Sequence, residues 1–342
     1  MGHSNGHGAE VEGSEEWYPR VSVVIPVYNG SNYLAEAIDS ALAQTYCNTE
    51  VIVVNDGSTD DGKTEEIALS YGEKIRYFRK ENGGVASALN MGIREMTGEY
   101  FSWLSHDDVY YPDKLRVQID WLARDRGDVV LFSDYDYIDG ESRLIGTKRM
   151  KHTETGAIYY SLIMEGSING CTVLVPNSCF ADVGLFKEDL RTTQDFDLWF
   201  RLARKYEFRH INQVLIKSRI HPLQCSITLP QHMEEQNDLY INALRDLVGG
   251  AALFDLKGTL SSFYVKAGIR LTSMGCTKAA DFAMRQFRMI LFKERPGQIM
   301  RNVARYTVYF VMRRVYKHEV PKKLIKSMNR FIQNRLVPLI RR

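Results

Sequence analysis

Three features are scarce in this sequence of 342 residues, and each scarcity disfavours a class of protein. No stretch reaches the roughly 18 consecutive apolar residues that a membrane-spanning helix needs. The five cysteines form no CxxC pair and are odd in number, which disfavours a zinc ribbon or a disulfide scaffold and favours a reducing compartment. Residues 1–18 lack the basic and apolar regions of a signal peptide, so we expect a disordered leader.

Glycine-rich phosphate loops are also missing. Neither GxGxxG nor GxxxxGK[ST] follows any predicted strand, so dinucleotide cofactors and P-loop hydrolysis are disfavoured. The composition is otherwise that of a globular protein, with 44% hydrophobic and 25% charged residues. The chain therefore has enough apolar side chains to bury a sizeable core.

Charge is distributed unevenly along the chain. The net charge is only +2, yet residues 285–342 hold 16 Lys and Arg residues against two acidic ones. Within this basic tail, Val303, Tyr306 and Phe310 recur at helical spacing among arginines, which is typical of an amphipathic helix at an anionic membrane surface. A helical subdomain that packs its apolar stripe on the body, or that forms a homodimer contact, is the alternative. We expect no nucleic-acid partner.

The first half of the sequence alternates predicted strands and helices. Five short apolar runs are typical of buried parallel strands, at residues 21–27, 51–54, 75–78, 100–104 and 129–132. Helical patterns separate them, at residues 33–44, 60–71, 85–96 and 112–122. This alternation predicts a doubly wound, mostly parallel α/β sheet. Ligands of such sheets bind beyond the carboxyl ends of the strands, where the strand order switches.

Polar residues follow three of these strands. Tyr28 and Asn29 follow the first strand, Asp56 follows the second, and Asp107 and Asp108 follow the fourth. Paired carboxylates are ligands that hard cations such as Mg²⁺ and Mn²⁺ prefer. An isolated Asp-Asp pair is more often a helix cap or a solvated turn. The shared sheet edge is what favours a binding site here.

The sequence resembles the family 2 glycosyltransferases of the GT-A fold in five ordered segments, namely VSVVIPVYNG, EVIVVNDGSTDDG, ENGGVASALNMGI, EYFSWLSHDD and GLFKEDLRTTQDFDLWFRL. The resemblance implies a Rossmann-like GT-A catalytic domain over residues 19–229, followed by a basic, mainly α-helical region over residues 230–342. It further implies an inverting, non-processive enzyme that uses a nucleotide-sugar donor, expected to be a UDP-sugar.

The resemblance also implies a role for each matching residue. The residues expected to hold the nucleotide are Pro26, Tyr28, Asn29, Asp56, Asn82, Gly84, Asn90 and Asp107. A divalent cation, Mn²⁺ or Mg²⁺, would be held by Asp108 and His221, and Arg219 would contact the diphosphate. Asp195 resembles the catalytic base that takes the acceptor proton. The alternative for Asp195 is an acidic residue that only stabilises the start of a helix.

The sequence departs from the family pattern in several places. Ser105 or His106 stands at the first position of the DxD motif, Leu89 stands where many members have Arg, and Gln194 replaces a common Glu. The first departure leaves fewer carboxylates for the cation. No Gln-x-x-Arg-Trp motif occurs, which argues against a processive polysaccharide synthase.

The expected acceptor is a hydroxyl of a saccharide or a lipid-linked saccharide in cell-surface glycan synthesis, and the expected location is the cytoplasm or the inner face of the cell membrane. Two other functions stay open from the sequence. A sugar-phosphate nucleotidyltransferase would need a basic, Gly-rich loop near the first strand, which PVYNGSNYL does not provide. A catalytically silent glycan- or nucleotide-binding module would leave the metal and base residues without a purpose.

Overall fold

The structure, a computed structural model, describes residues 17–124, 127–150, 158–166, 168–221, 229–248 and 259–291, together with Asn302, Tyr306 and Tyr309. Residues 1–16 of the predicted leader lie outside the described residues. So does nearly all of the basic tail, including Val303 and Phe310 of its predicted apolar stripe.

A mostly parallel sheet forms the N-terminal half, as the sequence predicted. Its strand order is β3-β2-β1-β4-β8, with the first four strands parallel and β8 antiparallel at one edge. The bounds are β1 Val21–Val27, β2 Thr49–Asn55, β3 Arg76–Arg79, β4 Tyr100–Trp103 and β8 Val175–Pro176. All seven residues of β1 are buried, because helices cover both faces of such a sheet.

Helices connect these strands in the predicted places. They are α1 Leu34–Leu42, α2 Lys63–Leu69, α3 Val85–Glu95 and α4 Lys114–Arg124, with a short 3-10 turn, η1, at Gly72–Lys74. The longer ones bury one face at helical spacing. In α1 the buried residues are Leu34, Ala37, Ile38 and Ala41, which repeat every three to four positions.

A second sheet was not predicted from the sequence. Its strand order is β5-β9-β6-β7, and β6 pairs with β9 in parallel. The bounds are β5 Val109–Tyr110, β6 Val129–Ile138, β7 Leu144–Lys148 and β9 Glu207–Arg219. The run at 129–132 is indeed a strand, but β6 belongs to the second sheet, and an isolated bridge pairs its Leu131 with Leu174, the residue before β8. Its main partner, β9, lies more than 70 residues later in the sequence, and no local sequence pattern predicts that the two strands pair.

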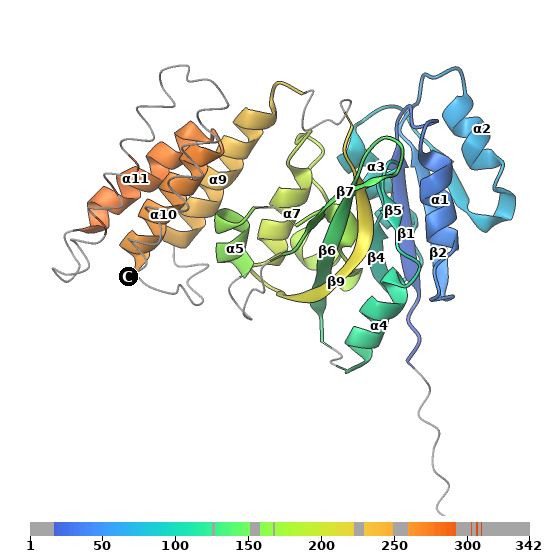
Figure 1. Ribbon diagram of the computed structural model, residues 1–342, viewed down its shortest axis with the longest axis horizontal. Helices are drawn as coiled ribbons and strands as arrows, with labels where there is room; N and C mark the ends of the chain where they lie inside the picture. The colour runs from blue at the N-terminus through green and yellow to red at the C-terminus, as the bar shows by residue number, and fades with distance from the viewer. Residues whose placement is uncertain are drawn as a thin grey trace, which may run out of the picture.

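The remaining elements are helical. Those between β7 and β9 along the chain are α5 Ile158–Met164, η2 Gly170–Thr172, α6 Ser178–Val183 and α7 Gln194–Leu202. The C-terminal helices are α9 His232–Val248, α10 Leu260–Ser273 and α11 Thr277–Leu291. Figure 1 shows them stacked at the end of the molecule opposite α1 and α2, which confirms the predicted helical C-terminal region. No helix in the described part of the chain is long and apolar enough to span a bilayer.

Two described residues of the basic tail contact α11. The ring of Tyr306 stacks on Phe287, with 5.6 Å between ring centroids. The Tyr309 hydroxyl donates a hydrogen bond to Asp281 Oδ1 at 2.6 Å. Since Tyr306 belongs to the predicted apolar stripe, at least this part of the stripe packs on the helical region, and the membrane contact stays a prediction.

Candidate active site

The loops after β1, β2, β3 and β4 meet at the carboxyl edge of the first sheet. The strand order switches between β1 and β4, and there Gly30 lies so close to His106 that an added Cβ would come within 2.5 Å of the imidazole ring. Asn29 joins the first two loops, because its backbone N–H donates to Ser58 Oγ at 2.9 Å and its Oδ1 accepts the Thr59 N–H at 2.7 Å. The loops that carry the predicted residues thus lie together at the switch point of the strand order.

The carboxylate of Asp56 is buried and held on three sides. Its Oδ1 accepts hydrogen bonds from Lys80 Nζ at 2.8 Å and from the Gly83 N–H at 3.0 Å, and its Oδ2 accepts the Gly84 N–H at 2.7 Å. An ionised carboxylate has about four acceptor positions. One position on Oδ2 therefore remains for an N–H donor of a ligand.

The other predicted nucleotide residues of this edge surround Asp56. The Asp56 N–H donates to the carbonyl of Val27, directly before Tyr28, whose side chain is 45% exposed. Pro26 lies inside β1 opposite Val54. Asn82 is exposed, and its backbone nitrogen would lie 2.7 Å from a Cβ at Gly57. Gly57 has φ +71°, so glycine is needed there for both the turn and the close approach.

Asn90 lies in α3, and its side chain forms hydrogen bonds to the segment that precedes α7. Its Nδ2 donates to the Phe186 carbonyl at 2.9 Å and to Glu188 Oε1 at 2.8 Å, and its Oδ1 accepts the Phe186 N–H at 2.9 Å. Asn90 is therefore a brace between α3 and the segment before α7. A nucleotide contact would require it to exchange these partners.

Asp107 and His221 meet although 114 residues separate them in the sequence. His221 Nε2 lies 2.9 Å from Asp107 Oδ2. The hydrogen bond to Asp107 raises the pKa of His221 above its usual value, more than burial lowers it. The structure thus brings together two of the residues predicted from separate motifs.

Asp108 lies in a different environment from its neighbour Asp107. Its Oδ1 accepts the backbone N–H of Arg219 at 2.8 Å. Burial, together with the nearby negative charge of Asp107, raises the pKa of Asp108 to about 7. The carboxyl of Asp108 therefore ties the end of β9 to the loop after β4.

The guanidinium of Arg219 is fully buried and engaged by the chain itself. Its Nε donates to the Asp107 carbonyl at 2.8 Å, and one terminal nitrogen donates to the Asp139 carbonyl at 3.0 Å and to Ser142 Oγ at 2.9 Å. The other terminal nitrogen forms an ion pair with Glu36. A diphosphate contact by Arg219 would require the side chain to leave these partners.

Asp107 and His221 suit a divalent cation that is shared with a substrate. They offer one oxygen and one nitrogen ligand side by side, and Mg²⁺ or Mn²⁺ commonly takes one or two carboxylates and completes its shell with phosphate oxygens and water. Within the described residues, no group of three His, Cys, Asp or Glu side chains gathers to hold an ion. The donor set fits a cation completed by a diphosphate better than a closed protein site.

Asp195 lies in the first turn of α7, whose N-cap is Thr193. Burial raises the pKa of Asp195 to about 6. Such a carboxyl is mostly ionised at neutral pH yet still basic enough to accept a proton. The loop before it contacts the loop after β3, because Arg191 Nη1 donates to the Gly83 carbonyl at 2.8 Å.

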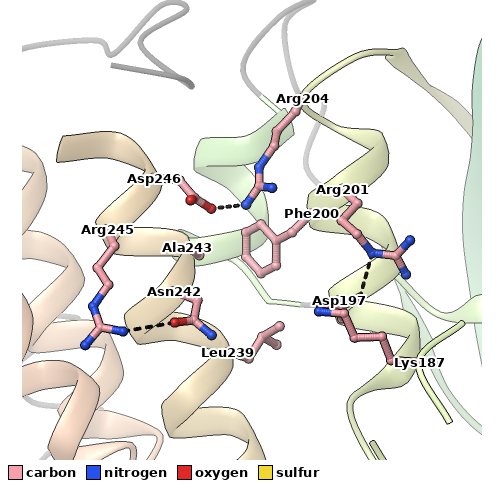
Figure 2. Close-up of a pocket in the computed structure, with 10 residues that line it drawn as sticks. All are labelled: Lys187, Asp197, Phe200, Arg201, Arg204, Leu239, Asn242, Ala243, Arg245 and Asp246. Carbon is pink, nitrogen blue, oxygen red and sulfur yellow. Dashed lines mark hydrogen bonds and ion pairs between the residues drawn. The ribbon is translucent and has the colours of Figure 1, made fainter. Parts of the chain in front are cut away.

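A hollow of about 240 Å³ opens between α7 and α9. Figure 2 shows Phe200 on α7, and Arg204 just after α7, facing Leu239 and Asp246 on α9. Arg204 and Asp246 form an ion pair across it. None of the sequence-predicted site residues lines this hollow, so we interpret it as the seam between two packed helices.

Sequence reasoning missed two residues that hold the site together. Lys80 comes directly after β3, so the same rule that indicated the ends of β1, β2 and β4 would have found it. Arg191 lies in a loop with no motif of its own, and its contact with Gly83 appears only in the folded chain.

The family model for glycosyl transferase family 2 matches residues 22–188. An uncharacterized glycosyltransferase of Rickettsia prowazekii is 47% identical over 270 residues, which cover 78% of this chain and 84% of that protein. The chain belongs to glycosyl transferase family 2. The predicted family and enzyme class are therefore confirmed.

Two further comparisons place this family 2 glycosyltransferase among longer and more distant proteins. An uncharacterized glycosyltransferase of Rickettsia felis is 51% identical over 233 residues, which cover 67% of this chain, but the match spans only 39% of that protein. The structure of S. aureus TarS 1-349 in complex with UDP-GlcNAc has a TM-score of 0.58 at 17% identity, covering 83% of this chain and 80% of that one. This likeness supports the predicted GT-A fold.

Proposed function

We propose that the protein transfers a sugar from a UDP-sugar to a hydroxyl of a saccharide or lipid-linked saccharide, with inversion at the anomeric carbon. The observation that carries the proposal is the held carboxylate of Asp56, which keeps one acceptor position free next to Tyr28. The uracil N3–H supplies one donor, and an exposed aromatic ring offers a face to a flat base. The UDP-GlcNAc complex of TarS supports the same donor class.

We assign the cation to Asp107 and His221, on the 2.9 Å contact between them. A bound cation would neutralise the negative charge that develops on the leaving diphosphate. Asp108 and Arg219 then act by position, since Asp108 holds the Arg219 backbone and Arg219 holds the Asp107 carbonyl. Together these two contacts keep His221, two residues beyond Arg219, within reach of Asp107.

Asp195 serves as the general base in this proposal. As the acceptor oxygen forms its bond to the anomeric carbon, the bond from that carbon to the diphosphate oxygen breaks, and the hydroxyl proton passes to the Asp195 carboxylate. Base catalysis of this kind contributes about 10²–10⁴-fold. Burial of Asp195 favours the role because it raises the proton affinity of the carboxylate.

The basic tail suggests where the acceptor lies. With 16 Lys and Arg residues from position 285 onward, the tail suits the anionic inner surface of a cell membrane, where lipid-linked saccharides are found. Liposome flotation of the full chain tests this, with anionic vesicles expected to bind at low salt and release at high salt. Failure to bind anionic vesicles at low salt would leave the helical packing seen for Tyr306 as the tail's role.

A donor screen by thermal shift tests the proposed function. UDP, UDP-sugars, GDP-sugars and dTDP-sugars are compared with and without Mn²⁺, because a bound ligand raises stability by mass action. We expect shifts with the UDP compounds, larger with Mn²⁺, and loss of the shift in Asp56→Asn. Release of UDP from the donor that binds best then measures turnover. A shift confined to GDP- or dTDP-sugars would contradict the assigned donor.

A further inference from the structure

Glu235, in the first turn of α9, accepts hydrogen bonds from the three residues that lead into α7. Its Oε1 accepts the Arg191 N–H at 3.0 Å, and its Oε2 accepts the Thr192 N–H and hydroxyl, each at 2.8 Å. The Thr193 hydroxyl is a further donor to Oε2 at 3.2 Å. Burial would raise the pKa of Glu235, but these donors outweigh it and the pKa lies below its usual value.

We propose that Glu235 is a positioning residue for the catalytic base, so that the C-terminal helical region completes the active site. The inference rests on the proposed function, because it takes Asp195 as the base. Thr193 is the N-cap of α7 and Asp195 lies in the first turn, so the place of this loop sets the place of the carboxylate. Both oxygens of Glu235 are used, which only a carboxylate at this position can provide.

The same loop reaches the donor side from its other face. Arg191 Nη1 donates to the Gly83 carbonyl at 2.8 Å, and it lies so close to Gly84 that an added Cβ there would come within 2.4 Å of it. The amides of Gly83 and Gly84 hold the carboxylate of Asp56. The clamp on the loop therefore also fixes the spacing between the base and the nucleotide site.

Helix α9 contacts α7 and the residues that flank it at several points, which holds α9 in place beside α7. Beyond the Glu235 contact, the rings of Phe196 and Phe200 lie edge-on to Tyr240, at 6.4 and 6.5 Å between centroids. The ion pair between Arg204 and Asp246 joins the far ends, as Figure 2 shows. This pair and the contact between Thr193 and Glu235 each join residues 42 apart in the sequence, so the two helices run in the same direction.

The boundary predicted at residue 229 thus falls between the base and its support. A chain that ends there keeps every residue assigned to chemistry but lacks Glu235. We expect the catalytic unit to include α9.

Two neighbouring glutamates give a matched test in the full chain. Glu235→Gln removes one acceptor from the clamp, whereas Glu234→Gln makes the same charge change on an exposed residue whose partner is Lys278 at 3.3 Å. We expect Glu235→Gln to lower kcat for UDP release about ten- to a hundredfold, because small misplacements of catalytic groups cost that much. The Kd for UDP should stay within about twofold of wild type, and Glu234→Gln should match wild type in both.

Amide hydrogen exchange tests the hydrogen bonds between Glu235 and residues 191–193, here called the clamp, without any enzymatic assay. The amides of Arg191 and Thr192 donate to Glu235, so the peptide that contains them should exchange faster in Glu235→Gln and not in Glu234→Gln. Thr192→Val removes one hydroxyl donor from the loop side and should lower kcat less. In the double variant with Glu235→Gln, Thr192→Val should lower kcat by less than it does alone, because both substitutions disrupt the same contact.

The outcomes separate the inference from the function on which it rests. Wild-type kcat in a Glu235→Gln protein with faster exchange overturns the positioning role, and unchanged exchange overturns the clamp itself. If Glu235→Gln loses thermal stability relative to Glu234→Gln, kcat and amide exchange are measured in Thr192→Val instead. Faster exchange with wild-type kcat in Thr192→Val then overturns the positioning role, and unchanged exchange overturns the clamp. A wild-type chain that releases no UDP from any UDP-sugar overturns the proposed function, and the positioning role with it.

Discussion

The proposed donor side and the proposed acceptor side of this site are built in different ways. On the proposed donor side, Asp56 directly follows β2 and Asp107 lies in the loop after β4, so the backbone ladder of one parallel sheet fixes where both loops begin. On the acceptor side, Asp195 stands on a helix whose leading loop is held by side chains, above all by Glu235 from α9. We therefore expect the position of the proposed base to be more sensitive to distant substitutions than the positions of the proposed nucleotide-binding residues.

Removal of the base should break the acceptor side alone and have the largest effect. We expect Asp195→Asn to lower kcat by about 10²-fold or more and to leave UDP affinity unchanged, because an amide cannot take the proton. Asp197→Asn is the control, since Asp197 is on the same turn but pairs with Lys187 and Arg201. Equal losses of UDP affinity and kcat in Asp195→Asn would point to a structural role at the helix start.

Loss of a metal ligand should break the donor side alone. We expect Asp107→Asn to weaken Mn²⁺-dependent UDP binding about 10- to 100-fold, because a neutral amide is a poor ligand for a hard cation. Asp108→Asn should have a smaller effect, since the Asp108 carboxyl accepts the Arg219 N–H and burial raises its pKa to about 7. Calorimetry with and without EDTA measures the UDP affinity of both variants. A larger loss of affinity in Asp108→Asn than in Asp107→Asn would assign the cation to Asp108 instead.

The pH dependence of the rate reports on the acceptor side. Because the pKa of Asp195 is raised to about 6, its base form is lost as the pH falls through that value. We expect kcat at pH 5 to be about tenfold lower than at pH 7, while UDP binding measured at the same pH values changes less. Asp195→Asn should lack this acidic limb. A rate that stays flat between pH 7 and pH 5 would exclude Asp195 as the titrating base.

The ion pair of Lys80 with Asp56 should give the smallest effect. Lys80→Met leaves the buried carboxylate with only its two backbone donors, and we expect UDP affinity to fall about fivefold while kcat stays near wild type. Lys74→Met, on the exposed turn η1, removes the same charge away from the site. Equal affinities in the two variants would show that the glycine amides suffice to hold Asp56.

The sequence by itself determined most of the donor side. Buried apolar runs are visible locally, so the predicted strands at 21–27, 51–54 and 100–104 fall on β1, β2 and β4, and the polar residues after them lie at one edge. The rule needs only a parallel sheet and the direction of its strands. Applied after β3, it would also have included Lys80.

Only the tertiary structure decided the rest. The pairing of β6 with β9, the contact of Asp107 with His221 and the clamp of Glu235 join segments from 42 to 114 residues apart. Such contacts are specific hydrogen bonds between distant segments, and they leave no periodic trace in either segment. The partners in these contacts are set by how helices and strands pack. Hydrophobic periodicity shows which face of an element is buried, but it does not show which other element covers that face.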